Sequence, residues 1–349
     1  MFTHLHPDPD ELRTQKARFA RHLRALLEQP ESGAGGLSYL PTPSGYRYAP
    51  PAPGPVQLLV IGGTRTESIL YSPETKSFER HRHAPTPVLH SSAELLKLVD
   101  SVREPTKTLL LNFTFPMRPH LEDETLDGLL LRGTKAHTLT DLTGQLIGHH
   151  LHEQLPKHPA VVVVNDITTL LTSFAPHHLQ VAGVLGTGSN FGLTHAEQCV
   201  NLETGNYADF SVDEAVRAID TASPNPGAQL WEKSISGKYL KDHFNHYAAQ
   251  SGLDLRLESS HQLDDIHEPA AAALSRAVYR RSASKVALTI AALLEQVGSE
   301  KVVMEGGLFW EAYGYYEFVR EYLTLLGHPR PTIIEANRPF HNLASILAA

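Results

Sequence analysis

An amide and a carboxylate, Asn165 and Asp166, directly follow four valines in the stretch VVVVNDITTL. A short apolar run that does not alternate with polar residues is typical of a strand buried on both faces. In open α/β sheets, ligands gather beyond the carboxyl ends of strands. Asp166 could therefore be a functional group at this edge of the sheet or simply a turn residue. Asn and Asp are also common helix caps, and for these two residues in isolation the cap is the favoured interpretation.

Three apolar segments end in small-residue loops: VIGGT at 60–64, VLGTGSN at 184–190 and VMEGGL at 303–308. Glycine lets a phosphate approach backbone N–H groups. Neither the Walker sequence nor the dinucleotide fingerprint is present, so classical NAD or P-loop binding is disfavoured. The segment GVLGTGSN alone is equally compatible with a tight hairpin turn. Three such loops in one chain are better explained by phosphates or a nucleotide close to the backbone.

Strand-like and helix-like segments alternate along the chain, which predicts α/β architecture. The segment QLLVIGG is expected to be a strand that pairs as a hairpin with ESILYSPE. The first helix is expected to end near Gln29-Pro30. Helical spacing of leucines predicts a helix over 138–155, and 270–298 is expected to form two helices in succession.

Composition limits the classes of partner. The formal net charge is -8 and the pI is about 6.2, so there is no basic signature for nucleic acid or an anionic membrane surface. No apolar run approaches the roughly 20 residues that span a bilayer, and the first residues lack the apolar centre of a signal peptide. A single cysteine, Cys199, excludes an intrachain disulfide and a Cys-based zinc cluster. We therefore expect a soluble cytoplasmic protein.

The chain has 21 histidines, and His149, His150 and His152 cluster in GHHLHE on an expected helix. No carboxylate stands at the spacing of a known zinc motif. Exposed histidines are therefore favoured over a metal site, and no protein-built metal site is predicted.

The order of these segments resembles the hexokinase and glucokinase family. LLVIGGT is similar to its first phosphate loop, LDGLLLRGTKAHT to its sugar segment, and VVVVNDITT to the stretch with its catalytic aspartate. VLGTGSN resembles its second phosphate loop, NLETGNYADF its sugar-binding glutamate segment, and EGGLFWEAYGYYEFVREYL its adenosine segment. The densest match is DTASPNPGAQLWEKSISGKYL. The matches keep the family's order and cover nearly the whole chain.

This resemblance implies an actin-like ATPase fold of hexokinase type, with two α/β lobes that each have a ribonuclease-H-like core. The small lobe is expected to comprise residues 56–164 and 333–349. The large lobe is expected to comprise residues 1–55 and 165–332, with a sugar cleft between the lobes. A monomer or homodimer is expected, with no nucleic acid or membrane partner.

The resemblance also implies a reaction, the transfer of the γ-phosphoryl group of ATP to the 6-hydroxyl of a hexose such as glucose. Asp166 matches the family's general base, and Lys135 could also offset charge on the transferring group. The positions that match sugar ligands are Thr134, Lys135, Asn165, Asp166, Asn190, Glu203 and Glu232. Amides and carboxylates suit the hydroxyls of a hexose. Read one at a time, Thr134-Lys135 would be a surface turn, and Glu203 and Glu232 would be solvated.

On the donor side, the resemblance implies ATP and Mg²⁺, with the metal held mainly through phosphates and waters. The residues matched to this side are Gly62, Gly63, Thr64, Arg65, Gly186, Thr187, Gly188, Gly306 and Gly307. None of them is expected to be a dedicated metal ligand.

The first phosphate loop departs from the family pattern. Val60 stands where the family has an acidic residue, Arg65 where it has Asn, and Glu67 where it has Arg. A valine cannot accept a hydrogen bond from a metal-bound water, whereas Arg65 is a fork donor that suits phosphates. FTFPMR lacks the serine and aromatic residue usual before its proline, and NRPFHNLASILAA replaces a glycine-rich turn. Two alternatives therefore stay open: a sugar-binding sensor with weak or no kinase activity, and a kinase that uses an unusual phosphoryl donor.

Overall fold

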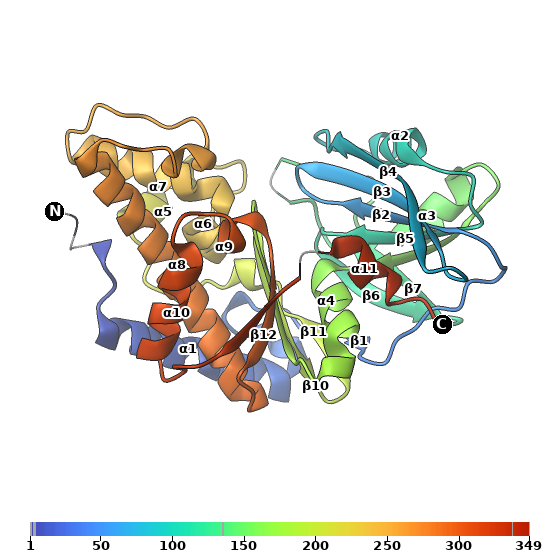
Figure 1. The fold of residues 1–349 in the computed structure, drawn as a ribbon, viewed down its shortest axis with the longest axis horizontal. Coiled ribbons are helices and arrows are strands. Elements are labelled where there is room, and N and C mark those ends of the chain that lie inside the picture. Colours follow the sequence, from blue (N-terminus) through green and yellow to red (C-terminus); the bar gives the residue numbers. More distant parts are fainter. Residues whose placement is uncertain (1, 3–4, 135, 337, 349) are drawn as a thin grey trace. The chain divides into compact units, whose positions relative to one another are not determined.

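Strands and helices alternate along the chain in the computed structural model, which describes residues 2, 5–134, 136–336 and 338–348. Figure 1 shows these elements coloured along the sequence. The chain divides into two compact units. Unit 1 comprises Met1–Tyr39, Leu179–His195 and Leu202–Asn337, and unit 2 comprises Leu40–His178, Ala196–Asn201 and Arg338–Ala349. Each unit combines strands with covering helices, so the predicted α/β class is confirmed.

The strands of unit 1 lie in the order β10-β9-β12-β13. Their bounds are β9 Val181–Leu185, β10 Ser189–His195, β12 Lys301–Glu305 and β13 Thr332–Glu335. β9 and β10 form an antiparallel hairpin, whereas β12 runs parallel to both β9 and β13. The carboxyl ends of β9 and β12 therefore lie at the same edge of the sheet, and each is followed by a predicted glycine loop.

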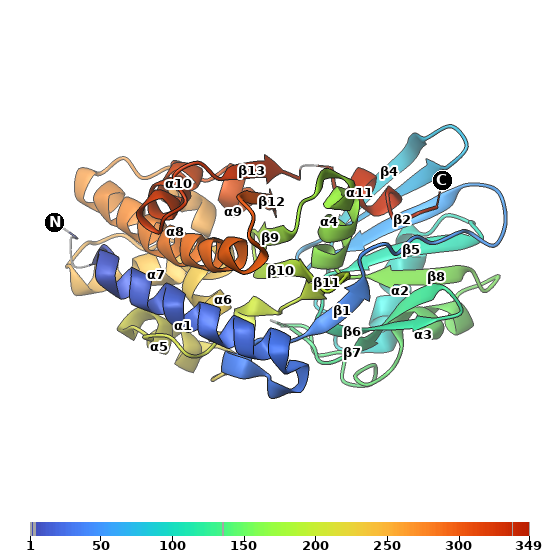
Figure 2. The same cartoon turned by 90° about the horizontal axis from the view of Figure 1, so that it is seen from below.

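The helices of unit 1 surround the long, buried helix α8. Their bounds are α1 Pro9–Glu28, α5 Glu214–Ala222, α6 Leu230–Ile235, α7 Gly237–Gln250, α8 Pro269–Val297, α9 Gly307–Trp310 and α10 Tyr315–Leu325. Short 3₁₀ turns are formed by Pro30–Ser32, Ala34–Gly36, Thr204–Asn206 and Ser260–Leu263. Helices α1, α7 and α10 pack against α8, and Figure 2 shows α1 running beside it. α1 ends at Glu28, close to the predicted stop.

The prediction of two helices over 270–298 is wrong, because α8 is one continuous helix of 29 residues. The segment RRSAS interrupts the apolar pattern at its centre. There the buried Ser282 hydroxyl donates to the carbonyl of Ile235 at 2.7 Å. Ser284 donates to the carbonyl of Arg281 at 2.8 Å. With these partners, polar residues are accommodated inside a buried helix without a break.

Unit 2 is built on a five-stranded sheet in the order β4-β3-β2-β5-β8. The bounds are β2 Val56–Ile61, β3 Arg65–Ser72, β4 Ser77–Pro85, β5 Thr108–Phe113 and β8 Ala160–Val164. β2, β5 and β8 are parallel, and β2 and β3 form the predicted hairpin. Val161 and Val163 enter one hydrophobic core and Val162 and Val164 the other. The valine run is therefore a strand buried on both faces, as predicted.

The remaining elements of unit 2 lie outside this five-stranded sheet. They are β1 Leu40–Pro43, paired with β11 Gln198–Asn201, the hairpin β6 Met117–Glu122 and β7 Thr125–Leu130, and the 3₁₀ turn Ala175–His177. The helices are α2 Ser92–Val102, α3 Ile147–Gln154, α4 Asp166–Phe174 and α11 Pro339–Ala344. Among the described residues, no helix is long and apolar enough to cross a membrane.

The helix predicted over 138–155 is only half correct, because α3 begins at Ile147. Upstream, Leu139 has φ of 43° and Gly144 has φ of 80°. Both lie in the left-handed region, which no α-helix continues through. The leucine spacing instead comes from turns whose side chains Leu139 and Leu142 enter the same core as α3. The expected lobe boundaries remain a prediction, with β13 paired to β12 in unit 1 and α11 in unit 2.

Candidate functional site

In unit 2, Asn165 and Asp166 lie where β8 ends and α4 begins. Asn165 is the N-cap of α4, and its side-chain oxygen accepts the N–H of Ile167 at 2.9 Å. Asp166 is the first residue of the helix, and its Oδ1 also accepts from Ile167 N at 2.8 Å. Asn165 is buried, whereas Asp166 is half-buried. The capping interpretation is therefore true of Asn165. Asp166 is left as a partly exposed carboxylate near the positive end of a helix.

The segment matched to sugar contacts in unit 2 is tied to the first glycine loop by a histidine that the sequence reading did not single out. Buried His137 lies three residues after Thr134, and its N–H donates to the Thr134 carbonyl at 3.0 Å. Its Nδ1 is 3.1 Å from Leu89 N, and its Nε2 is 3.2 Å from the carbonyl of Gly63. Because Leu89 N–H can only donate, Nδ1 accepts and Nε2 carries the proton. Lys135 lies outside the described residues.

The first glycine loop closes the β2–β3 hairpin. Gly62 N donates to the carbonyl of Arg65 at 2.9 Å, so Gly62, Gly63 and Thr64 form the turn itself. Arg65 opens β3, and its Nε lies 2.9 Å from the carboxylate of Glu67. The guanidinium that was expected to meet phosphates is thus paired along its own strand. Its side chain is 60% exposed, so this ion pair is weak and readily exchanged.

In unit 1, the three residues matched to sugar ligands are linked by backbone contacts. Asn190 Oδ1 accepts from Phe191 N at 2.8 Å and from Thr204 N at 3.2 Å, next to Glu203. Glu232 Oε2 accepts from Ser189 N at 3.1 Å. The structure therefore brings Asn190, Glu203 and Glu232 into one polar group.

Two members of this group have unusual environments. Glu232 is only 5% exposed, although its position on a helix suggested solvation from sequence. Glu203 has φ of 46°, in the left-handed region that non-glycine residues seldom adopt. Burying a carboxylate and holding a glutamate in this conformation both cost free energy. Such costs cluster at functional sites, so these two residues are the strongest structural sign of a ligand site here.

Three glycine segments converge at the carboxyl ends of β9 and β12. Gly186 N donates to the carbonyl of Gly188 at 2.9 Å, which makes this loop the tight hairpin turn considered above. A Cβ on Gly306 would lie 2.2 Å from the carbonyl oxygen of Leu185, and one on Gly237 would lie 2.7 Å from that of Gly186. Only backbone fits between these segments. Gly237, which begins α7, was missed in the sequence reading, although it lies in the densest matching segment.

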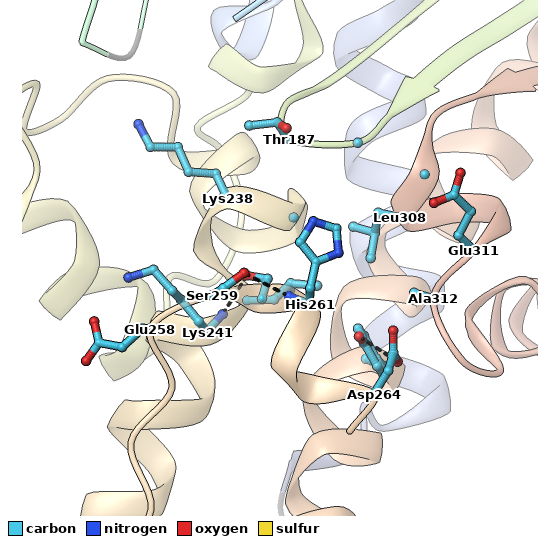
Figure 3. Close-up of a pocket in the computed structure, with 16 residues that line it drawn as sticks. Thr187, Lys238, Lys241, Glu258, Ser259, His261, Asp264, Leu308, Glu311 and Ala312 are labelled. Atoms are coloured by element: carbon cyan, nitrogen blue, oxygen red, sulfur yellow. Dashed lines mark hydrogen bonds between the residues drawn. The ribbon is translucent and has the colours of Figure 1, made fainter. Parts of the chain in front are cut away.

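The three converging segments at Gly186, Gly237 and Gly306 are called the glycine cradle below. Beside the glycine cradle lies a cavity of about 540 Å³ that is lined by residues of unit 1 alone. Figure 3 shows Lys238, Lys241 and Glu258 on one side and Leu308, Glu311 and Ala312 on the other. The lining residues are Gly186, Thr187, Gly237, Lys238, Leu240, Lys241, Glu258, Ser259, Ser260, His261, Asp264, Tyr279, Gly307, Leu308, Glu311 and Ala312.

The two lysines give this cavity a cationic side close to the glycine turn. Lys238 and Lys241 lie three residues apart at the start of α7 and so share a face. The backbone N–H of Lys238 donates to the Thr187 carbonyl at 3.2 Å, which joins α7 to the loop. On the far side, Tyr279 donates to Asp264 Oδ1 at 3.0 Å. Burial, reinforced by Asp264, raises the pKa of Tyr279, so its hydroxyl remains a donor. The signal in sequence was SGKYLKD, where two lysines follow a glycine at helical spacing.

A nucleotide suits this cavity, because its volume of about 540 Å³ is in the usual range of ligand pockets and its lining includes Lys238 and Lys241. Among the described residues, no group of three or more His, Cys, Asp or Glu side chains is arranged to hold a metal ion.

Known proteins resemble this chain in sequence and in fold. No family model matches the chain. Human Hexokinase-2 is 28% identical over 279 residues, which cover 68% of this chain and 30% of that protein. Hexokinase-2 of Solanum tuberosum is 29% identical over 177 residues, covering 43% of this chain and 36% of that protein. A solved hexokinase from Schistosoma mansoni in complex with glucose has a TM-score of 0.76 at 19% identity, covering 98% of this chain and 96% of that chain.

The chain is similar to hexokinases in sequence over about two thirds of its length and in fold over nearly all of it. Its fold is the two-lobed hexokinase fold with two mixed sheets. The matched segments span about a third of the length of the curated hexokinases named above. A ROK family glucokinase from Streptomyces griseus, solved with glucose and AMPPNP, shares the fold more distantly. Its TM-score is 0.59 at 14% identity, with 84% of this chain and 98% of that chain covered.

Proposed function

We propose that this protein is a member of the hexokinase family and transfers the γ-phosphoryl group of ATP to the 6-hydroxyl of a hexose such as glucose. The observation that carries the proposal is the position of Asp166. It is a half-buried carboxylate at the first residue of α4, directly after a strand buried on both faces. Such a strand and helix fix the carboxylate in space, which a general base requires. The solved neighbours in complex with glucose support the choice of sugar.

On the acceptor side, Asp166 accepts the proton of the 6-hydroxyl while that oxygen attacks the γ-phosphorus. We assign the ring hydroxyls to Thr134, Lys135, Asn165, Asn190, Glu203 and Glu232. In this assignment buried Glu232, whose Oε2 already accepts from Ser189 N, also accepts hydrogen bonds from sugar hydroxyls. Lys135 offsets negative charge on the transferring group. Positioning and charge stabilisation carry most of the barrier reduction in phosphoryl transfer.

On the donor side, we assign the glycine cradle and its cavity to ATP. We assign the phosphates to the loop Gly186–Gly188 and, in unit 2, to the loop Gly62–Arg65, with Lys238 and Lys241 as additional cations. Gly306 and Gly307 face the adenosine, whose apolar surface suits Leu308 and Ala312. ATP with Mg²⁺ supplies the phosphoryl group and part of the charge that neutralises it. The chain itself binds and orients the reacting groups and excludes water from them.

A coupled assay of the purified protein with Mg-ATP and a panel of hexoses tests the proposal. Turnover with at least one hexose, identified as the 6-phosphate by NMR, is the expected result. Calorimetry with the same sugars separates binding from catalysis. Measurable glucose binding without turnover for any sugar or donor would reject the kinase and leave the sensor.

The sensor is the second candidate, and one observation favours it. The first glycine loop has Val60 in place of the family's acid, and the guanidinium of Arg65 is paired with Glu67 at 2.9 Å. The donor side of unit 2 thus offers few groups for phosphates or hydrated metal. Cytoplasmic location, the lobe boundaries and a monomeric or homodimeric state remain predictions. Sedimentation of the purified chain tests the last of these.

A further inference from the structure

A second, smaller cavity in unit 1 is lined by a buried lysine and a partly buried arginine that the proposed reaction does not use. It has a volume of about 190 Å³ and lies between α1, the start of α5 and α8. The lining residues are His6, Pro7, Glu11, Leu12, Gln15, Ser211, Val212, Asp213, Arg281, Ser284 and Lys285. Arg281 and Lys285 lie four residues apart on α8 and so share one face of that helix.

The cations in this cavity have fewer partners than their burial demands. The Lys285 side chain is only 8% exposed, and its Nζ has no hydrogen-bond partner. Its nearest carboxylate oxygen, Asp213 Oδ2, is 3.8 Å away, beyond hydrogen-bond length. Arg281 Nε also has no hydrogen-bond partner. Buried donors left unpaired are costly, so an acceptor that enters the cavity would bind with a large gain.

Asp213 does not remove this deficit, because both of its oxygens are engaged. Oδ1 accepts from Val216 N at 2.9 Å as the N-cap of α5, and Oδ2 pairs with the terminal nitrogen of Arg281. The Asp213 carboxylate therefore faces two cations, the buried Lys285 and the partly buried Arg281. Glu11 also lines the cavity, but its side chain is exposed and accepts from Gln15 at 2.9 Å.

The surroundings of Lys285 also indicate that the cavity lacks negative charge. Its ammonium lies 5.3 Å from the ring of Phe210 and 5.9 Å from that of Trp231, which are neutral partners. Burial, with Arg281 nearby, lowers the pKa of Lys285 to about 8. Burial disfavours the positive charge of Lys285, and an anion bound beside it would stabilise that charge.

We propose that this cavity is a binding site for a phosphate group, either free phosphate or the phosphate of a small metabolite. Lys285 supplies a charged N–H donor from the floor of the cavity, and Arg281 Nε supplies a second one turn away. Both are donors suited to phosphate oxygens. The limited volume excludes a nucleotide but admits a phosphate with a few further atoms. The site is separate from the glycine cradle, and the inference does not rest on the proposed kinase activity.

Calorimetric titration of the full chain with inorganic phosphate, at constant ionic strength set by chloride, tests this site. The double variant Lys238→Met with Lys241→Met, called the silenced variant, removes the two lysines of the cavity beside the glycine cradle. It should keep one phosphate-binding event. Adding Lys285→Met should weaken that event at least about tenfold, because a charge-assisted hydrogen bond is lost. Methionine keeps the length and the apolar contacts of the side chain.

A second variant guards against misfolding. Ser211 is exposed at the edge of the cavity, so Ser211→Phe should block entry without disturbing the buried cluster. It should abolish phosphate binding in the silenced background while leaving near-UV circular dichroism unchanged. Tighter binding of glycerol phosphate than of phosphate would identify a phosphomonoester as the ligand, and equal binding would identify free phosphate. Absence of phosphate binding in the silenced variant, or binding that survives both Lys285→Met and Ser211→Phe, would overturn the proposal.

Discussion

Tyr279 and Arg281 are two residues apart on helix α8 and line two different cavities. Successive helical residues turn by about 100°, so these side chains leave α8 on nearly opposite sides. Tyr279 reaches the cavity beside the glycine cradle, and Arg281 reaches the cavity that Lys285 also lines. One rigid, buried helix therefore forms a wall of both. A ligand that shifts α8 at one cavity would be felt at the other, which gives the second cavity a physical route to influence the first.

The first prediction concerns the assigned base. Asp166→Ala should lower kcat by about 10²- to 10⁴-fold, because positioned base catalysis contributes that much. Hexose affinity should change by no more than a few-fold, since Asn165 continues to cap α4. Steady-state kinetics and sugar calorimetry measure the two quantities. Asp254→Ala, in an exposed loop, is the matched control. A near-normal rate for Asp166→Ala would remove this residue from the role.

The second prediction concerns the glycine cradle. Gly237→Ala would place a Cβ 2.7 Å from the carbonyl oxygen of Gly186, so the loop must move. Displacement near 1 Å costs up to about 100-fold in rate when positioning matters. We expect kcat/KM for ATP to fall by about 10- to 100-fold, with hexose affinity retained. Gly45→Ala, where no atom lies within 4 Å of the new Cβ, should have no effect. Equal kinetics for the two variants would show that the cradle does not position the donor.

The third prediction concerns the first glycine loop. Val60 and Glu67 lie directly opposite each other in the β2–β3 hairpin. Val60→Asp would therefore face a like charge and lower the free energy of unfolding by about 0.2–1 kcal/mol. The double variant Val60→Asp with Glu67→Arg replaces this repulsion by attraction. It should restore stability and raise kcat/KM above that of Val60→Asp alone.

Denaturant unfolding and the coupled assay complete this double-variant cycle. Glu67→Arg alone is the control for simple release of Arg65 from its partner. If the double variant gained nothing over Val60→Asp in either measurement, the two positions would not act as a pair.

The fourth prediction concerns pH. Burial lowers the pKa of His243 to about 4, against an ordinary value of 6.5. Between these values the unfolded chain binds a proton that the folded chain does not, so the free energy of unfolding falls as pH falls from 6.5 to 4. The loss attributable to this residue is on the order of 3 kcal/mol. Asp213 adds to the loss at lower pH. Burial alone would raise its pKa, but Lys285 and Arg281 hold it well below the ordinary value.

Guanidinium unfolding curves at pH 4, 5, 6 and 7 measure this dependence. His243→Phe should be less stable at neutral pH, because the bond from Nε2 to the Lys233 carbonyl at 2.9 Å is lost. Its slope between pH 6.5 and 4 should be much shallower than that of the unchanged protein. His267→Phe, at an exposed position, should keep the full slope. A slope equal in all three proteins would place the pH dependence elsewhere.

Much of the fold was predictable because the local pattern and the tertiary environment agree. The valine run of β8 lacks alternation, and its side chains do enter two cores. The β2–β3 hairpin followed from two apolar strands and a Gly pair. The helix over 138–155 failed because leucines in turns can reach a core at helical spacing. The break in α8 was wrong because buried serines found carbonyl partners that no sequence pattern reveals.

The candidate site, like the fold, was predictable from sequence only in part. The glycine loops and the Asn165-Asp166 pair could be recognised from the sequence, since few other residue types suit those backbone positions. Gly237, Lys238 and Lys241 were missed because their role depends on contact with a loop about fifty residues earlier. The unpaired donors of Arg281 and Lys285 were also missed. Their deficit appears only when the positions of all neighbouring acceptors are known.

The glycine cradle also limits which substitutions the cavity can accept during evolution. At Gly237 and Gly306 an added Cβ would collide with backbone, not with flexible side chains, so these positions tolerate almost no variation. The residues around them, such as Lys238, His261 and Glu311, line the cavity through their side chains and are under no such restriction. Adaptation to a different phosphoryl donor would therefore proceed by exchanging rim side chains over an unchanging main-chain floor.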